Sequence, residues 1–384
     1  MELQTEHLIL REMTESDFDS LKAVLADSDI MNHYPYTFDD ERIRDWIKRN
    51  IERYRIFGFG LWAVCLKDNC EMIGDCGLTM QMIGKTIKPE IGYHIRKDMQ
   101  RRGFAREAAF AVRDWTFKNT TFNEIYSYMK STNEPSAKCA QSWGCKFAEE
   151  LKDEENEITK VFCITREEWT FMMNLKAYDV SASSFDKKIG SLSNYDEAYN
   201  FFASFLKKGD KILDSACGPG NISRYLNNVV SDLDLTLMDL SSNMLEIASS
   251  YLPNARILQS NICDFELNEK FDAIINGFGL PYLFPDETEQ HFKTVYNHLK
   301  AGGIYYVSFM DVNAERYPGK ENYVQEEHPS FNPDVTIRVN YYSQDSIVKK
   351  LTAIGFELLK KWNLDYKEPD GSITTDVVLV FRRR

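Results

Sequence analysis

Long apolar runs are missing from this 384-residue sequence, and no stretch approaches the roughly 20 residues that a membrane-spanning helix needs. The opening segment, MELQTEHLILREM, also lacks the basic and then apolar pattern of a signal peptide. None of the eight cysteines forms a Cys-x-x-Cys pair, so neither a zinc site nor a disulfide framework is indicated. We therefore expect reduced thiols, no metal site and a cytoplasmic protein.

Positive charge is scarce relative to negative charge. The chain has 46 Lys and Arg against 59 Asp and Glu, a net charge of −13, which argues against nucleic acids and anionic membranes as partners. The three arginines at 382–384 are expected to be a solvated tail. Internal repeats and low-complexity segments are also absent. The length and the 43% apolar fraction suit two separate cores, each in a domain of roughly 150–200 residues.

Residues 1–170 predict a mixed, mostly antiparallel α+β domain. Apolar residues at three- and four-residue spacing predict helices over 17–25, 39–55 and 102–118, and Pro135 opens a further one. Apolar runs bounded by Gly, Asn and Asp predict strands over 8–11, 61–66, 72–78, 90–95 and 125–129.

From about residue 195 the pattern changes to regular strand–helix alternation. Strands are expected over 211–215, 235–238, 255–258, 273–276 and 304–310, and helices over 195–206, 221–226, 243–250 and 287–299. This order predicts a Rossmann-like, doubly wound parallel sheet. Strand-like segments over 336–342, 356–365 and 377–382 then predict an antiparallel edge. The expected fold is thus a two-domain α/β protein, with domains 1–170 and 177–384.

The segment Glu90–Ala105 joins a strand to a helix through a turn at Gly103. Amide groups of such a turn and of the helix start can converge on a diphosphate. Arg101 and Arg102 add positive charge beside an anionic ligand. A turn of this kind is by itself more often structural than functional, so its context decides.

That context resembles the GNAT acetyltransferases. Gln100-x-x-Gly103-x-Ala105 is similar to their pyrophosphate loop, and Glu90-Ile-Gly-Tyr93 is similar to the preceding strand of the Rim-type branch. Further similar features are Thr5-x-x-Leu8-x-Leu10-Arg11, Ile73-Gly74 and Asn133-x-x-Ser136. The resemblance covers residues 3–169. It implies acetyl-CoA as donor and an amine, on a protein N-terminus or a small molecule, as acceptor.

The resemblance also implies roles for individual residues. Backbone amides from Gln100 to Ala105, Phe104 included, would hold the CoA pyrophosphate. Strand residues including Tyr93 and Ile95 would pair with the pantetheine arm, and Asn133 would bind an amide of that arm. Ser136 could give a proton to the departing thiolate, or could merely begin a helix.

Three further positions near this strand are open or depart from the family. Glu90 could act as a base through water, or could be an ordinary exposed carboxylate at the strand edge. His94 has no identifiable partner in the sequence, and we interpret it as structural. Cys145 follows Gly144 where the family usually has Phe, which could reshape the rim of the acceptor pocket.

A second glycine turn lies in Lys211–Ile222, after the first strand of the parallel sheet. Ligands of doubly wound sheets bind at this edge. A dinucleotide motif would place Gly where Ser223 stands, and Pro219 interrupts the turn. Asp214, within the strand, suits an amino-bearing ligand better than a diphosphate.

Leu213-Asp-x-x-Cys217-Gly218-x-Gly220 resembles motif I of class I S-adenosylmethionine (SAM) methyltransferases. The similarity continues through Met238–Met244, Asn261–Asp264, Phe271–Ile275 and Leu299–Gly303, and covers about 178–384. It implies that Gly218 and Gly220 approach the amino-acid end of SAM, which Asp214 orients, and that Asp239 binds the ribose. Asn261 and Ile262 would meet the adenine, although the family more often has Asp at position 261.

Other residues are expected to line or cover the SAM pocket: Tyr178, Phe185, Ala216, Cys217, Leu240, Met244, Asn276 and Tyr282. His291 and Tyr282 could also touch the acceptor. No Asn-Pro-Pro-Tyr signature follows the fourth strand, which argues against nucleic-acid base amines and favours a small-molecule acceptor.

The leading hypothesis is a bifunctional transferase that uses acetyl-CoA and SAM. Two alternatives stay open: one domain is a non-catalytic cofactor sensor that regulates the other, or the protein modifies an antibiotic. Acceptor pockets are expected around 30–40, 80–88 and 311–340, where the sequence shows no decisive chemistry.

Overall fold

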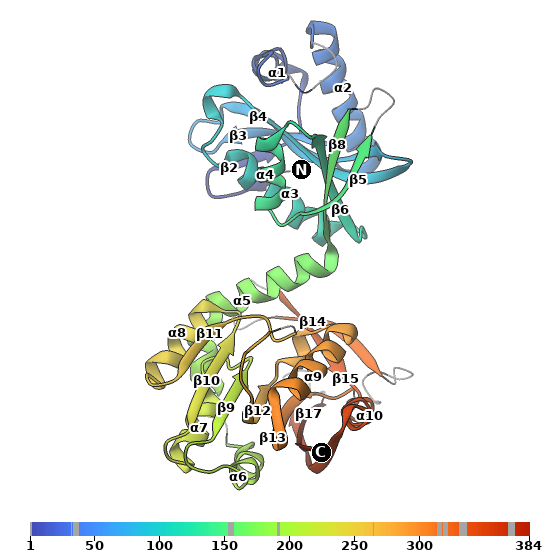
Figure 1. The fold of residues 1–384 in the computed structure, drawn as a ribbon. Coiled ribbons are helices and arrows are strands. Elements are labelled where there is room, and N and C mark those ends of the chain that lie inside the picture. Colours follow the sequence, from blue (N-terminus) through green and yellow to red (C-terminus); the bar gives the residue numbers. More distant parts are fainter. Residues whose placement is uncertain are drawn as a thin grey trace. The chain divides into compact units, whose positions relative to one another are not determined.

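The computed structural model describes residues 2–31, 33, 38–152, 157–189, 193–263, 265–312, 317, 322–329, 336–367 and 373–384. The chain divides into two compact units, unit 1 (Met1–Trp169) and unit 2 (Thr170–Arg384), each with its own sheet (Figure 1). All eight cysteines are free thiols. In the described part of the chain, no helix is long and apolar enough to cross a bilayer, and no cluster of side chains could hold a metal ion.

Unit 1 is built on an eight-stranded sheet in the order β1-β2-β3-β4-β5-β6-β8-β7. Its strands are β1 (Glu2–Gln4), β2 (Leu8–Arg11), β3 (Leu61–Leu66), β4 (Met72–Ile83), β5 (Thr86–Ile95), β6 (Glu124–Lys130), β7 (Lys146–Lys152) and β8 (Ile158–Thr165). Neighbours are antiparallel except β5 and β6. The predicted mixed sheet is confirmed, but three of its strands, β1, β7 and β8, were not predicted. Most of β7 is exposed and shows no alternation of buried and exposed residues.

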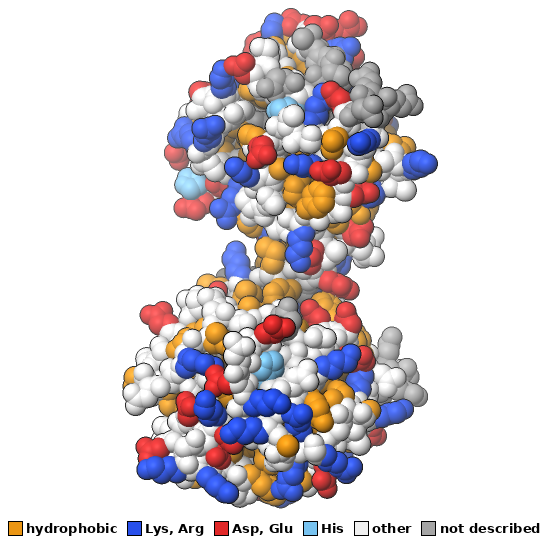
Figure 2. Space-filling model, viewed as in Figure 1, with side chains coloured by type: hydrophobic (Ala, Val, Ile, Leu, Met, Phe, Trp, Pro, Cys, Tyr) orange, Lys and Arg blue, Asp and Glu red, His pale blue; other side chains and the backbone are white. Residues whose placement is uncertain are grey.

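Helices cover both faces of this sheet. They are α1 (Phe18–Leu25), α2 (Asp40–Phe57), α3 (Phe104–Asn119) and α4 (Glu134–Ser142). Apolar residues of α1 and α2 share a core with Leu61 and Ala63 of β3. Trp62 points to the opposite face, because side chains alternate along a strand, and meets Trp115 of α3 edge-to-face at 5.1 Å. On the face in view, acidic and basic side chains of unit 1 are interspersed (Figure 2).

Unit 2 has a seven-stranded sheet in the order β11-β10-β9-β12-β13-β17-β16. Its strands are β9 (Lys211–Ser215), β10 (Asp234–Asp239), β11 (Arg256–Gln259), β12 (Phe271–Gly277), β13 (Leu299–Met310), β16 (Phe356–Lys367) and β17 (Ile373–Arg383). The first five strands in that order are parallel, and β17 and β16 form an antiparallel edge. The predicted doubly wound sheet with an antiparallel edge is therefore confirmed.

Two helical layers enclose the unit 2 sheet (Figure 1). One core cluster joins one face to α6 (Asp196–Ala203), α7 (Asn221–Val229) and α8 (Ser242–Tyr251). A second cluster joins the other face to α9 (Pro285–His298) and α10 (Gln344–Ile354). Helix α5 (Arg166–Ile189) occupies the segment where the sequence predicts a domain boundary.

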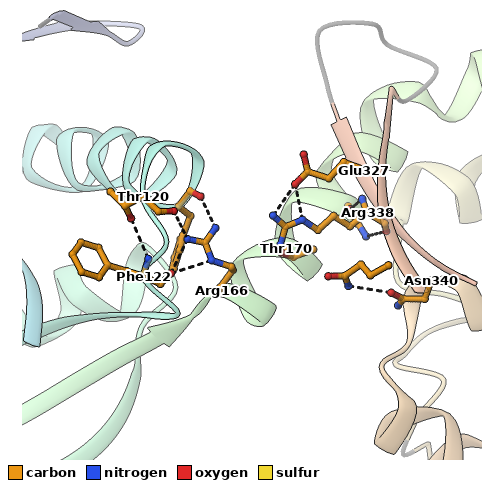
Figure 3. Close-up of polar contacts among 10 residues, drawn as sticks. Thr120, Phe122, Arg166, Thr170, Glu327, Arg338 and Asn340 are labelled. Carbon is orange, nitrogen blue, oxygen red and sulfur yellow. Dashed lines mark hydrogen bonds and ion pairs between the residues drawn. The ribbon is translucent and has the colours of Figure 1, made fainter. Parts of the chain in front are cut away.

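The segment expected to extend the sheet edge at 336–342 lies elsewhere. It is strand β15 (Thr336–Tyr342), which pairs with β14 (Tyr323–Pro329) in a separate two-stranded sheet. This hairpin docks on α5 through Asn174, whose amide group exchanges two hydrogen bonds with the backbone of Arg338 (2.7 and 2.8 Å). The Arg338 guanidinium also donates to Thr170 and pairs with Glu327 (Figure 3). Side-chain bonds of this kind are not visible in a strand pattern.

Arg166 closes the C-terminal end of α3 within unit 1. Its guanidinium donates to the backbone oxygens of Phe117, Thr120 (2.7 Å) and Phe122 (2.7 and 3.0 Å) (Figure 3). The last carbonyls of a helix have no partner inside the helix, and positive charge is favourable there. Arg166 therefore satisfies groups that burial would otherwise leave unpaired.

We expect Arg166→Met to lower the free energy of unfolding of unit 1 by about 2–4 kcal/mol, because several charge-assisted bonds are lost. Lys48→Met, on an exposed turn of α2, is the matched control and should change stability by less than about 0.5 kcal/mol. Denaturant unfolding combined with hydrogen exchange of α3 measures both. Equal stability of the two variants would contradict the capping role.

Candidate active sites

In unit 1, the parallel strands β5 and β6 are paired at one position. Glu90 pairs with Tyr126, whereas β5 stays paired to β4 as far as Ile95. The backbone of Gly92–Ile95 therefore faces an opening on its β6 side that a further extended chain could enter. This opening fits the pantetheine arm that the sequence predicts here.

The loop after β5 turns through two residues with left-handed backbone, Arg101 (φ 59°) and Gly103 (φ 90°). A Cβ atom at Gly103 would meet nothing within 4 Å, so the backbone angle rather than crowding calls for glycine. Gln100 fixes the loop by donating to the oxygen of Ile95 at 2.9 Å. Gly103 is the N-cap of α3, whose first residues, Phe104 and Ala105, follow directly. Amides in such a turn form an anion-binding concavity, so these residues fit a diphosphate.

Asn133 and Ser136 lie at the start of α4. The Asn133 side chain accepts a hydrogen bond from the Ser136 amide at 3.2 Å and thereby caps the helix. The Tyr93 hydroxyl donates to the Ser136 backbone oxygen at 2.9 Å and lies 3.3 Å from its Oγ. The structure thus brings these three predicted residues together beside the strand opening.

Glu90 lies inside unit 1, with 8% of its surface exposed. Thr79 donates to its carboxylate at 3.1 Å, and burial raises the pKa of Glu90 to about 7. A Cβ atom on Gly92 would come within 3.2 Å of a carboxylate oxygen, so the Glu90 side chain extends over Gly92. The alternative interpretation of Glu90 as an exposed strand-edge carboxylate is therefore wrong.

Sequence reasoning missed a partner of His94. Its Nδ1 lies 2.7 Å from Oδ1 of the fully buried Asp75, and Trp46 donates to the other Asp75 oxygen at 2.9 Å. Burial opposes protonation of His94, but the charge of Asp75, its hydrogen bond and Glu90 together raise the pKa of His94. The β4–β5 register places Asp75 opposite His94. Correct alignment of that hairpin would have revealed the pair.

Glu90, Gly92 and His94 share one face of β5, because side chains alternate along a strand. Two acidic groups and an imidazole thus gather beside the opening between β5 and β6. Such a group can bind a cationic amine and take protons from it. Of the expected acceptor loops, the described part of 80–88 is the β4–β5 hairpin, whereas 32, 34–37, 313–316, 318–321 and 330–335 lie outside the described residues.

Unit 2 contains a cavity of about 990 Å³ beside the strand ends. Ten of the predicted cofactor residues line it: Tyr178, Asp214, Ala216, Cys217, Gly218, Asp239, Leu240, Met244, Asn261 and Ile262. Gly220 is the N-cap of α7 (φ 80°), and the fully buried Asn276 accepts from the Gly279 amide at 2.9 Å. These two residues support the cavity from outside its lining.

Asp239 connects the ends of β9 and β10. Its two carboxylate oxygens accept the amides of Gly218 and Ser241, each at 2.9 Å. Burial raises the pKa of Asp239. Each oxygen retains capacity for a second hydrogen bond, so the carboxylate can receive two neighbouring hydroxyls. This arrangement fits the ribose of SAM.

Asp214 lines the cavity and has an acceptor oxygen without a partner among the described residues. Ser223 donates to its Oδ2 at 2.6 Å, whereas its buried Oδ1 has no hydrogen-bond partner among the described residues. Burial raises the pKa of Asp214 to about 7. An unpaired buried acceptor is costly unless a ligand or water meets it. Asp214 therefore fits the amino group expected there.

The remaining predictions for the cavity have mixed outcomes. Tyr178, Phe185 and Tyr282 all line it. The rings of Tyr178 and Phe185 meet edge-to-face at 5.7 Å, and the Tyr178 hydroxyl is hydrogen-bonded to that of Tyr282. His291 is fully buried against Ile262, Asn276 and Tyr305, and burial lowers its pKa to about 4. His291 is therefore a neutral core residue. The Asn261 side chain accepts the Cys263 amide at 2.9 Å, and Asp264 lies outside the described residues.

The raised pKa of Glu90 predicts a pH-dependent stability of unit 1. The folded state holds the proton up to about pH 7, whereas an unfolded chain releases it near 4.5, so stability falls as pH rises between these values. Glu90→Gln removes this pH dependence. The free energy of unfolding of the variant minus that of wild type should therefore rise by about 3 kcal/mol between pH 4.5 and pH 8. Denaturant unfolding at several pH values, with the exposed Glu150→Gln as control, measures it. A difference independent of pH would contradict the buried carboxyl.

Two family models match the chain: an acetyltransferase (GNAT) domain over residues 7–146 and a methyltransferase domain over residues 212–303. YkkB of Bacillus subtilis (strain 168) is 28% identical over 151 residues, which are 39% of this chain and 88% of that protein. The N-acetyltransferase p20 of Bacillus licheniformis is 30% identical over 156 residues, which are 40% of this chain and 86% of p20.

Unit 2 has relatives of its own. The carboxy-S-adenosyl-L-methionine synthase of Campylobacter fetus subsp. fetus (strain 82-40) is 31% identical over 107 residues, 27% of this chain and 45% of that protein. The chain thus spans about half the length of the relatives that match unit 2. The two matched families bind acetyl-CoA and SAM, respectively. The chain belongs to the GNAT acetyltransferases through its N-terminal unit and carries a SAM-dependent methyltransferase domain in its C-terminal unit.

Proposed function

We propose that both units turn over: unit 1 transfers an acetyl group to an amine of a small molecule or peptide, and unit 2 methylates a small molecule. The observation that supports this most strongly is common to both units. Each has a glycine turn after a strand and, on that strand, a buried carboxyl with a pKa of about 7, Glu90 or Asp214. A structural turn alone has no need of a buried carboxyl without an ion pair on the strand that precedes it.

In unit 1, the amides from Gln100 to Ala105 would hold the pyrophosphate, and the open edge of β5 would align the pantetheine arm. Bound acetyl-CoA supplies the thioester. Glu90 takes a proton from the acceptor amine, directly or through water, while Asp75 holds the imidazole of His94 on the same face of β5. Tyr93 holds the Ser136 hydroxyl at the end of the opening, where it can give a proton to the leaving thiolate.

In unit 2, Asp239 would bind the ribose and Asp214 the amino group, while Gly218 allows close approach of the backbone. SAM supplies the methyl group on its sulfonium. The protein's contribution is alignment and exclusion of water, since in-line displacement depends mostly on these. Tyr178, Phe185 and Tyr282 provide an aromatic cover for that purpose.

Asp239→Asn should weaken binding of SAM roughly 10- to 100-fold, because charge-assisted bonds to the ribose are lost. Asp234→Asn, at the exposed start of the same strand, is the control and should leave affinity unchanged. Titration calorimetry gives both dissociation constants. If the Asp239 variant binds SAM as tightly as wild type, Asp239 does not bind the ribose.

Glu90→Gln should lower kcat for acetyl transfer roughly 10²–10⁴-fold and leave the dissociation constant of acetyl-CoA unchanged, because the base acts on the acceptor. Acceptors are found by mass spectrometry of cell extract incubated with the protein and isotope-labelled donors. The exposed Glu150→Gln is the control. If wild type yields no labelled product from either donor while binding both, the proposal of two active units fails and a cofactor sensor is favoured.

A further inference from the structure

The cavity of unit 2 extends beyond the residues assigned to SAM. Those residues lie at the ends of β9 and β10 and after β11. A separate part of the lining comes from α6, α7, the loop after β12 and the start of β17. We call this part the aromatic annex; it consists of Tyr195, Tyr199, Tyr225, Phe278 and Asp376.

The four rings of the annex form one connected group. Tyr195 meets Phe278 edge-to-face at 5.9 Å and stacks on Tyr199 at 6.0 Å, and Tyr199 contacts Tyr225 at 5.2 Å. Several aromatic rings around one space attract an organic cation through their π faces.

Phe278 has an unfavourable backbone conformation, with φ of 59°. This region is costly for a bulky side chain and persists only where the surroundings impose it. Ser308 imposes it by accepting the Phe278 amide on its backbone oxygen (3.2 Å) and its Oγ (3.1 Å). The strained turn directs the ring of Phe278 into the cavity wall beside Tyr195.

Asp376 adds negative charge to these rings. Its Oδ2 accepts a hydrogen bond from the Tyr195 hydroxyl at 2.6 Å. In the antiparallel pairing of β13 and β17, Asp376 lies opposite Met310 at the end of β13. Among the described residues, four aspartates line the cavity, Asp186, Asp214, Asp239 and Asp376, together with two cations, Lys187 and Arg224. Arg224 is paired with Asp186 at 2.9 Å, so the described lining keeps an excess of acidic side chains.

We infer that the aromatic annex binds the methyl acceptor, and that this acceptor is an amine that enters as an organic cation. The inference rests on the proposed methyl transfer. Transfer to nitrogen needs its lone pair, so the ammonium must first give one proton to Asp376. The N–C bond then forms as the S–C bond of the donor breaks, and the electron pair of that bond stays on sulfur.

The sulfonium of SAM is itself an organic cation, so the test uses S-adenosylhomocysteine, which has an uncharged sulfur. Full-length protein is first titrated with S-adenosylhomocysteine. Choline, or its uncharged tert-butyl analogue in which carbon replaces nitrogen, is then titrated into the loaded protein, and both steps are followed by NMR and calorimetry. We expect choline to bind at least about tenfold more tightly than the analogue.

Asp376→Asn should remove most of this preference while the affinity for S-adenosylhomocysteine stays within about twofold, which also shows that the variant folds. Asp365→Asn is the matched control, since it removes a carboxylate on the adjacent strand β16 that bonds Thr375 outside the cavity. Phe278→Leu is a second variant with the same expected loss.

Equal binding of choline and its analogue, or competition of choline with S-adenosylhomocysteine, would overturn the inference. A preference for choline that Asp376→Asn and Phe278→Leu both leave intact would overturn it as well. Failure of S-adenosylhomocysteine to bind would instead refute the proposed methyl transfer, and the inference with it.

Discussion

Both candidate sites depend on backbone that leaves a sheet before its hydrogen bonds are complete. Polar backbone groups that lie away from water must find partners, so an opening of this kind persists only where a ligand or water can complete it. In unit 1 the opening is the separation of β6 from β5 after Glu90. In unit 2 it is the turn after β9, where Ala216, Gly218 and Gly220 all have positive φ angles. The cost of these conformations is local, and the packed sheets around them supply the stability.

Buried carboxyls give these openings their chemistry. Glu90 and Asp214 are each held by one hydroxyl, from Thr79 or Ser223, and neither has an ion pair among the described residues. A carboxylate with so few donors is destabilised by burial, which raises its pKa towards neutrality. Such a group responds strongly to a positively charged ligand, because the ligand supplies the missing partner. Amines and the amino-acid end of SAM are ligands of this kind, so the same physical device suits both units.

Prediction from the sequence succeeded where the information is local. The strands 8–11, 61–66 and 211–215 have the predicted bounds, and both glycine turns lie at strand ends as expected. It failed where a partner is distant in the chain. His94 acquires its role from Asp75 through the β4–β5 register, and β15 was correctly expected as a strand but pairs with β14 rather than with the large sheet. His291 offered a reactive side chain but is enclosed by residues of other elements.

The same distinction explains why donors are easier to infer than acceptors. The segments proposed to bind the donors, Gln100–Ala105 and Asp214–Gly220, are consecutive backbone, and consecutive backbone leaves a continuous pattern in the sequence. The aromatic annex instead combines side chains from positions as far apart as Tyr195 and Asp376, which meet because β17 lies beside the start of α6 in the folded unit. A contact between residues so far apart in the chain leaves no short sequence motif from which it could be predicted. Its chemistry must be inferred from the side chains that line the cavity, and there aromatic rings and an excess of carboxylate point to a cation.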